Sequence, residues 1–385
     1  MPSIDRHHQQ LVRSALGRRS FLRMAGLAGL GVAGAGALAA CGGSDTGAGT
    51  GGSSSGGSAD YGDLAIQLSW IKNIEFAGEY FADSKGYFKD AGFSSVNLIA
   101  GGAAGTSAEA AVTTGKALVG LSAPTLTAPA INEGAPLKII GATFQKNAFC
   151  IVSLDSNPIP DPAAMAGKKI GVQSGGNEQI FSGLLKANGI DPSSLTIVPV
   201  QYDPTVVTTG EVDGFMAYLT NEPILLQGKG FKTVQFAFAD HGLPLVTETF
   251  TVAQQTIEED RDKLKAFLKA EILGWTDALN DPQEGARLAV EQYGKDLNLN
   301  LDEQIQEINA QATLIVTADT VQNGLFTMTD ELVATNIESL ATAGTTITAE
   351  ELFDLSLIQE VYSEDPSLIT GPTLTPEAAA SAAPA

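Results

Sequence analysis

From residue 63 to about residue 255, the chain alternates short apolar runs with segments of helical spacing. The runs "DLAIQLSW" and "VNLIAGG" are typical of strands, and they lie on either side of a predicted helix over residues 75–85. Two further predicted helices end at Gly115 and Gly134, and each is followed by an apolar run, "ALVGLS" or "LKIIGATF". This alternation predicts an α/β fold, with a parallel sheet and helices on both of its faces.

The pattern then starts again at "KKIGVQ", with the helix "NEQIFSGLLKANG", the strand "LTIVPVQ", a helix near Val206 and the strand "GFMAYL". The tetrapeptide "VTTG" occurs at 112–115 and again at 207–210, each time at a predicted helix end before a short strand. The repeat favours two similar α/β lobes across a cleft, although "VTTG" is also a common way to end a helix. From about Thr256 the apolar spacing predicts helices with few strands among them.

The first forty residues have a different composition. Five arginines precede the run "MAGLAGLGVAGAGALAA", which is 17 residues long and too weakly apolar for a stable membrane span. Such an order is typical of an export signal. "RRSFLRM" (18–24) resembles a twin-arginine signal, and "LAAC" (38–41) resembles a bacterial lipobox. We therefore expect residues 1–40 to be a signal peptide and Cys41 to carry a lipid that anchors the exported protein to the outer face of the cytoplasmic membrane.

Both ends of the remaining chain are rich in small residues. Residues 41–60 contain the predicted lipidated cysteine and then almost only Gly, Ser and small polar residues, which indicates a flexible tether. Residues 366–385 are rich in Pro and Ala and are predicted to be a disordered tail.

Charge narrows the range of partners. The chain has 22 basic and 44 acidic residues and a net charge of −22. Loss of the predicted signal removes five arginines and one aspartate, which moves the net charge to about −26. Because so acidic a surface repels phosphates, we expect no nucleic acid partner. Membrane attachment would depend on the lipid and not on a basic patch.

Cysteine and histidine are scarce. If Cys41 carries a lipid, Cys150 is the one remaining cysteine, so no intrachain disulfide is expected. His241 is the one histidine beyond the predicted signal, and we interpret it as a loop residue. The sequence therefore predicts no His/Cys metal cluster and no cofactor, and it offers no convincing catalytic triad.

Candidate ligand contacts follow the predicted strands, because ligands of open α/β sheets bind outside the strand carboxyl ends. The segment "WIKNIEF" (70–76) places an indole, a cation and an amide after the first strand, where they can stack on a flat ligand and bind its edge. In "QSGGNEQ" (173–179), two glycines allow close backbone approach to a ligand, and a helix begins there. An ordinary turn capped by Asn177 is the alternative.

Three further loops are candidates. "YLTNEP" (218–223) follows a strand, and Asn221 is either a helix cap or a cleft residue. "GLSAPTL" (120–126) offers hydroxyl donors, and "FQKN" (144–147) is predicted to cross between the two halves. The full set of predicted ligand contacts is Trp70, Lys72, Asn73, Glu75, Phe76, Tyr80, Ser122, Thr125, Phe144, Lys146, Ser174, Gly175, Gly176, Asn177, Tyr218, Asn221 and Glu222.

The segments "WIKNIEFAGEYFADSKGYFKDAGF", "GKKIGVQSGGNEQ" and "VDGFMAYLTNEP" resemble the periplasmic solute-binding proteins of the nitrate, sulfonate, taurine and thiamine-pyrimidine-synthase-like group. The resemblance covers roughly residues 63–365. It implies a type II periplasmic-binding fold, with a first lobe at 61–145 plus 247–365, a second lobe at 146–246, a hinge, and C-terminal helices packed on the first lobe. It also implies a monomer that binds a small solute by lobe closure and delivers it to the permease of an ABC importer.

The residue types in the candidate loops bear on the ligand. These loops contain aromatic residues and no arginine, which favours a flat heterocycle such as a thiamine pyrimidine precursor or a flavin-like ring. A sulfonate, taurine or nitrate anion is the alternative. A pyrimidine-synthase-like enzyme and a structural surface lipoprotein are further alternatives, and we expect the protein not to be an enzyme.

Overall fold

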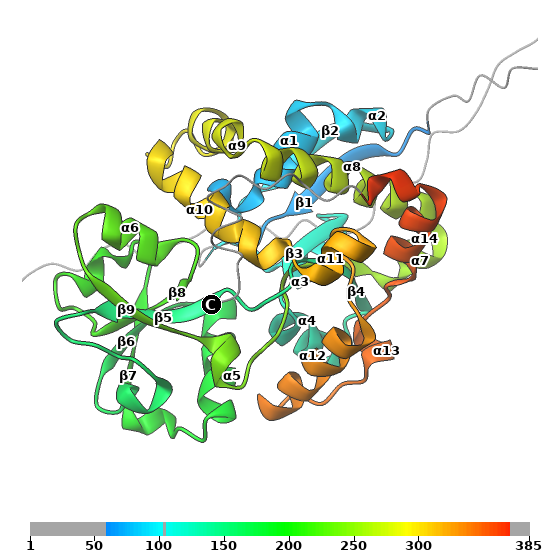
Figure 1. Ribbon diagram of the computed structural model, residues 1–385. Helices are drawn as coiled ribbons and strands as arrows, with labels where there is room; N and C mark the ends of the chain where they lie inside the picture. Colours follow the sequence, from blue (N-terminus) through cyan, green and yellow to red (C-terminus); the bar gives the residue numbers. More distant parts are fainter. Residues whose placement is uncertain (1–58, 103–104, 370–385) are drawn as a thin grey trace, which may run out of the picture. The chain divides into compact units, whose positions relative to one another are not determined.

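The structure is a computed structural model that describes residues 59–102 and 105–369. The described residues belong to one compact unit and contain two five-stranded sheets (Figure 1). The first sheet consists of β1 (Gly62–Gln67), β2 (Phe93–Ile99), β3 (Val119–Ser122), β4 (Leu137–Phe144) and β10 (Thr247–Ala253). The second consists of β5 (Phe149–Leu154), β6 (Lys169–Gln173), β7 (Thr196–Val200), β8 (Gly214–Tyr218) and β9 (Thr233–Ala237).

The two sheets have equivalent strand orders, β2-β1-β3-β10-β4 and β7-β6-β8-β5-β9. The prediction of purely parallel sheets is wrong for one strand in each, because β10 pairs antiparallel with β3 and β4, and β5 with β8 and β9. Both exceptions are the first strand after the chain crosses from the other sheet. The crossing strand enters from the edge where its neighbours end, so it runs against them.

Helices cover the sheets as the alternating pattern predicts. The predicted helix at 75–85 is a 3-10 turn, Ile74–Phe76, that continues as α1 (Ala77–Ser84). The helices before β10 are α1, α2 (Tyr87–Asp90), α3 (Ala108–Thr113), α4 (Pro124–Asn132), α5 (Gly176–Ala187) and α6 (Glu222–Gly228). Those after it are α7 (Gln254–Glu259), α8 (Arg261–Asn280), α9 (Pro282–Leu288), α10 (Leu301–Ile315), α11 (Ala318–Asn323), α12 (Asp330–Thr342), α13 (Ala349–Leu352) and α14 (Ser356–Glu364).

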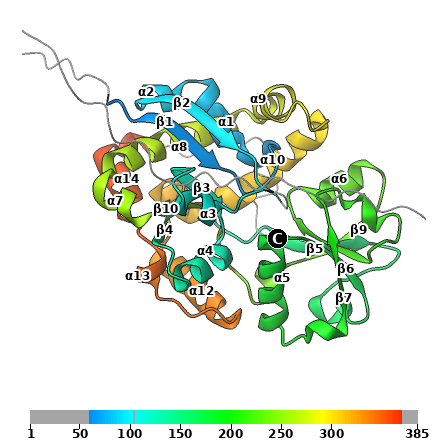
Figure 2. The same cartoon turned by 180° about the vertical axis from the view of Figure 1, so that it is seen from behind.

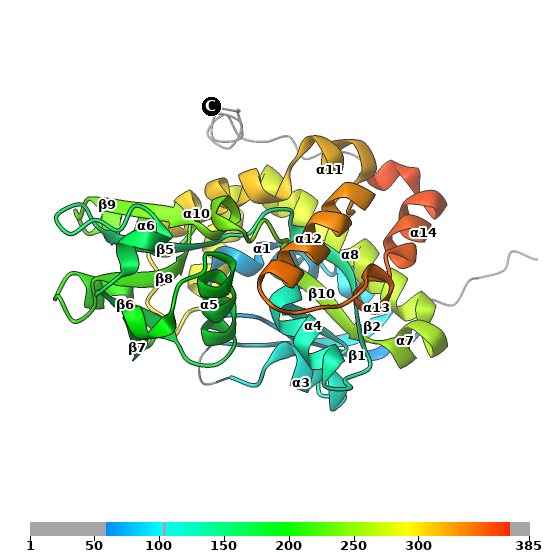
Figure 3. The same ribbon diagram turned by 90° about the horizontal axis from the view of Figure 1, so that it is seen from below.

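We call the first sheet and the helices packed on it the first lobe, and the second sheet with α5 and α6 the second lobe. The C-terminal helices pack on the first lobe, as predicted: α8 lies on α1, and α14 on α8. Helices α12 and α10 also contact the second lobe, through α5 and α6 respectively, and α5 also packs on α4 (Figures 2 and 3). The exact domain boundaries stay a prediction.

The packing of α1 on α8 requires glycine on both helices. A Cβ at Gly78 would lie 2.1 Å from the Trp275 ring, and one at Gly274 would lie 2.2 Å from the Gly78 carbonyl oxygen. Since no side chain fits there, the two backbones approach closely, and Glu79 and Glu271 are buried beside them. This contact belongs to the hydrophobic core of the first lobe, in which Trp275 is 1% exposed.

Two adjacent segments join the lobes. Residues 145–148 lead from β4 to β5, which confirms "FQKN" as a crossing, and residues 238–246 lead back from β9 to β10. Asn147 of one segment donates from Nδ2 to the Leu243 carbonyl of the other at 2.9 Å, and its Oδ1 accepts from the Phe149 N–H. The crossings are thus hydrogen-bonded to each other.

Several predictions lie wholly or partly outside the described residues. They concern the signal at 1–40, the lipid on Cys41, most of the tether and the tail beyond residue 369. Residues 366–368, at the start of the predicted tail, form a 3-10 turn. Within the described ranges, Cys150 is a buried free thiol, and no helix is long and apolar enough to cross a membrane.

Candidate functional site

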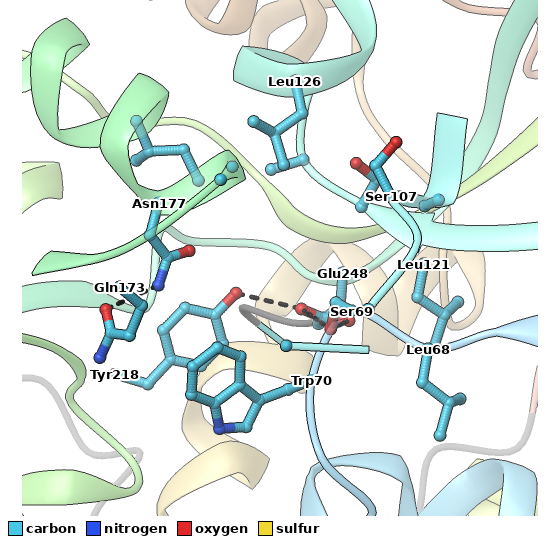
Figure 4. A pocket seen from close by; sticks show the side chains of 18 of the residues that line it. Leu68, Ser69, Trp70, Ser107, Leu121, Leu126, Gln173, Asn177, Tyr218 and Glu248 are labelled. Atoms are coloured by element: carbon cyan, nitrogen blue, oxygen red, sulfur yellow. Dashed lines mark hydrogen bonds between the residues drawn. The ribbon is translucent and has the colours of Figure 1, made fainter. Parts of the chain in front are cut away.

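A cavity of about 170 Å³ lies between the lobes, where strands of both sheets end (Figure 4). The first lobe contributes residues that follow β1, the end of β3 and the start of α3, and the second contributes the ends of β6 and β8 and the start of α5. Equivalent strands of the two sheets therefore meet at one site. This is the position at which ligands bind open α/β sheets.

The structure brings ten of the predicted contacts to this cavity. They come from four separate loops: Trp70, Glu75, Ser122, Ser174, Gly175, Gly176, Asn177, Tyr218, Asn221 and Glu222. Trp70 and Tyr218, from different lobes, both line it. Tyr218 is fixed by an edge-to-face contact with Phe149, whose ring centroid lies 4.5 Å from its own.

Seven predicted contacts do not line the cavity: Lys72, Asn73, Phe76, Tyr80, Thr125, Phe144 and Lys146. Phe76 and Phe144 are buried in the hydrophobic core of the first lobe. Thr125 is buried within α4, and Lys146 is exposed on a crossing segment.

Asn73, Tyr80 and Lys72 have local structural surroundings instead. The Asn73 side chain caps the 3-10 turn by accepting from Glu75 N and donates to Glu307 at 3.0 Å. Tyr80 donates to the Asn73 carbonyl at 2.8 Å and stacks on Tyr293. Lys72 is half-exposed outside the cavity. The sequence pattern alone does not separate buried residues such as Asn73 and Tyr80 from ligand contacts.

Sequence reasoning missed several lining residues, above all Ser69, Glu109, Gln173 and Glu248. Ser69 and Gln173 each adjoin a predicted contact, so a wider window around those loops would have found them. Glu248 had no such signal, because β10 was not among the predicted strands. Glu109 looked like an ordinary acidic residue in the first turn of a helix, where such residues are favourable.

The cavity is acidic. Glu75, Glu109, Glu222 and Glu248 line it, and all four are at most 8% exposed. Among the lining residues that the structure describes, there is no lysine, arginine or histidine. Buried carboxylates are normally paired with cations or hydrogen-bond donors. The cavity therefore favours a ligand that brings donors or positive charge.

Two of these glutamates meet beside Ser69. The Ser69 hydroxyl donates to Glu248 Oε2 at 2.8 Å and lies 3.4 Å from Glu75 Oε1. Burial raises the pKa of Glu75 well above its ordinary value, and the neighbouring Glu248 charge raises it further. Burial also raises the pKa of Glu248, against hydrogen bonds from Glu75, Ser69 and Tyr218 that lower it. We infer that Glu75 carries the proton of this pair and that Glu248 is the carboxylate.

The other two glutamates each have their own donors. Glu109 Oε1 accepts from the hydroxyls of Ser122 and Thr127. Glu222 Oε2 accepts from the Tyr218 backbone N–H at 2.8 Å. Burial raises the pKa of Glu222 to about 7.

The side chains of Asn177 and Asn221 do not cap α5 and α6, contrary to the alternative explanation for these two residues. Asn177 Nδ2 donates to Gln173 Oε1 at 2.9 Å, and α5 begins after Gly175 without a side-chain cap. Gly175 has a φ of 91°, which suits glycine. Asn221 makes no capping bond at α6, and its side chain has no hydrogen-bond partner among the described residues although it is 7% exposed. Its amide is free to bind a ligand.

No group of three or more metal-ligating side chains occurs within residues 59–102 and 105–369. The described lining combines apolar and aromatic side chains with carboxylates, amides and hydroxyls, which suits a small organic molecule.

A family model described as "NMT1/THI5 like" matches residues 73–285, which is more than half of the chain. The chain belongs to this family. The resemblance that the aromatic first loop and the glycine loop indicated is therefore confirmed. The match spans both lobes, from Asn73, which caps the 3-10 turn before α1, to Gly285 within α9.

A relative and two solved structures are also similar to this chain. The riboflavin-binding protein RibY of Chloroflexus aurantiacus is 26% identical over 239 residues, which cover 59% of this chain and 66% of that protein. The nitrate-binding protein NrtA of Synechocystis has a TM-score of 0.57 at 14% identity, covering 82% of this chain and 93% of its own. The alkanesulfonate-binding protein SsuA of Xanthomonas axonopodis has a TM-score of 0.54 at 14% identity, covering 76% and 96%.

These structural neighbours are binding proteins, and they confirm the predicted periplasmic-binding fold with two α/β lobes. The chain therefore has the fold of these binding proteins. At such low identity the neighbours establish the fold and not the ligand.

Proposed function

We propose that this protein is the solute-binding component of an ABC importer and that it binds a flat heterocycle with an N–H-rich edge. The observation that carries this proposal is the cavity itself, which combines Trp70 and Tyr218 with four buried glutamates and has no basic side chain among its described lining residues. Aromatic rings contact the faces of a flat ring, and carboxylates accept hydrogen bonds from its edge.

The charge of the cavity argues against the alternative ligands. A nitrate or sulfonate ion in the cavity would meet the like charge of the Glu248 carboxylate in a site of low dielectric, with no basic side chain among the described lining residues to offset it. The nitrate- and sulfonate-binding neighbours thus share the scaffold, but we propose a different ligand class for this chain.

Two heterocycles remain candidates. The relationship to a riboflavin-binding protein supports a flavin-like ring. The cavity volume of about 170 Å³ supports a single substituted ring such as a thiamine pyrimidine precursor, since a cavity of about 150 Å³ holds benzene. A three-ring flavin would require the lobes to move apart.

The proposal includes lobe closure, delivery to a permease, and a role in binding and not in catalysis. It also includes export, lipid attachment at Cys41 and a monomeric state, which follow from the sequence and from the usual arrangement of such systems. Closure would occur about the two crossing segments that Asn147 joins.

Thermal denaturation of the purified protein with a ligand panel tests the proposal. The panel contains 4-amino-5-hydroxymethyl-2-methylpyrimidine, riboflavin, taurine and nitrate, each at 1 mM or at its solubility limit. We expect the pyrimidine or riboflavin to raise Tm, because a ligand that binds only the folded state stabilises it. A rise with taurine or nitrate alone would contradict the proposed ligand class.

A further inference from the structure

Glu248 accepts hydrogen bonds from both lobes. Ser69 of the first lobe donates to Oε1 and Oε2 at 3.0 and 2.8 Å, and the Tyr218 hydroxyl of the second lobe donates to Oε1 at 3.0 Å (Figure 4). A carboxylate has about four acceptor positions, so Glu248 keeps acceptor capacity beyond these bonds. It lines the cavity while only 3% exposed.

The backbone of Glu248 is strained. Its φ of 50° lies in the left-handed region, which costs a residue with a side chain roughly 1–2 kcal/mol. The pairing of β10 with β4 also shifts in register between Thr249 and Thr251, next to this residue. The strain therefore coincides with the start of the crossing strand, at the cavity.

The groups around Glu248 leave its charge without a cation. Glu75 lies beside it on the 3-10 turn, and Glu79 of α1 is close enough for the Glu248 charge to raise its pKa. Ser69 and Tyr218 supply hydroxyl donors only. Across the cavity, Asn221 offers an amide with no hydrogen-bond partner among the described residues.

Resting on the proposed function, we propose that Glu248 determines specificity by selecting a ligand with an amino-substituted, protonatable ring edge over one with a carbonyl edge. The same carboxylate then joins the bound edge to Tyr218, so that ligand recognition and contact between the lobes depend on one group. A carbonyl edge would place its oxygens against the carboxylate, whereas amino groups and a protonated ring nitrogen would donate to it.

Isothermal titration calorimetry with 2,4-diaminopyrimidine and uracil tests this, since the two probes share a ring and differ in amino against oxo groups. We expect wild type to bind the diamino probe at least tenfold more tightly. Glu248→Gln should weaken diamino binding at least tenfold and change uracil binding less than threefold. Glu271→Gln is the matched control, because Glu271 is equally buried in the first lobe but does not line the cavity; it should keep the wild-type preference.

Tyr218→Phe is a second variant, in case Glu248→Gln does not fold. Loss of the hydroxyl removes the donor of the second lobe, and we expect threefold to tenfold weaker diamino binding. An unchanged preference in Glu248→Gln, or wild-type binding without a preference for the diamino probe, would overturn the assignment of Glu248. If a heterocycle of the ligand panel above still raised Tm, the proposed function would stand; if no heterocycle bound, both proposals would fall.

Discussion

Two groups of buried glutamates in the first lobe differ in what surrounds them. At the cavity, Glu248 accepts from Ser69 and Tyr218. In the core between α1 and α8, Glu79 and Glu271 have no hydrogen-bond partner on any carboxyl oxygen among the described residues. Burial raises the pKa of Glu79 to about 8 and that of Glu271 well above its ordinary value. Hydrogen bonds to Glu248 thus oppose the effect of burial on its pKa, whereas Glu79 and Glu271 avoid a buried charge because their raised pKa values keep them protonated.

The largest expected effect tests how tightly the core region is packed. Gly78→Ala would place a Cβ 2.1 Å from the rigid Trp275 ring, so we expect a loss of about 4 kcal/mol or more in the free energy of unfolding. Chemical denaturation measures it. Gly183→Ala is the control, since its Cβ would lie 3.3 Å from the Ala343 methyl and 4.0 Å from Leu243 Cδ1, and helix propensity offsets these contacts. Equal losses of unfolding free energy in both variants would show that α1 and α8 move to accommodate the added methyl group at residue 78.

The next effect concerns the protons on the core pair. Glu79 and Glu271 hold protons in the folded state at pH values where the unfolded chain has released them. Their contribution to the free energy of unfolding is therefore fully present below about pH 4.5 and is lost as the pH rises. For Glu79 this loss extends to about pH 8 and is on the order of 5 kcal/mol. Denaturation at pH 5 and pH 8 should therefore show a less stable protein at pH 8.

Glu271→Gln sharpens this prediction because it removes one of the two titrating groups. We expect the variant to be more stable than wild type at pH 8 by roughly 1–3 kcal/mol and to differ little at pH 5. The same pH dependence in variant and wild type would mean that the core carboxyls do not cause it.

The smallest expected effect on stability is at the cavity. Asn221→Ala should change the free energy of unfolding by no more than about 0.5 kcal/mol, because its side chain neither caps α6 nor bonds another described residue. Binding of whichever panel heterocycle raises Tm should weaken in this variant. A loss near 1 kcal/mol with unchanged binding would restore the capping explanation.

Much of the fold followed from local patterns. The helix over 75–85, the strand "LKIIGATF" and the repeated "VTTG" before β3 and β8 were predictable, because periodicity and glycine stops are local properties. The antiparallel strands β5 and β10 were not, since their direction depends on where the chain crosses between lobes. Glu248 is the same kind of case: only the assembled sheets bring it to Ser69 and Tyr218.

The paired crossings have a consequence for motion. Asn147 hydrogen-bonds one crossing segment to the other through the Leu243 carbonyl, so the two lobes are joined by two adjacent backbone segments and not by a single linker. In the proposed lobe closure, two joined connections would allow bending about one axis and would resist twisting. Each closure would then return Tyr218 to Glu248, so that the permease in the proposed function would meet one reproducible closed form.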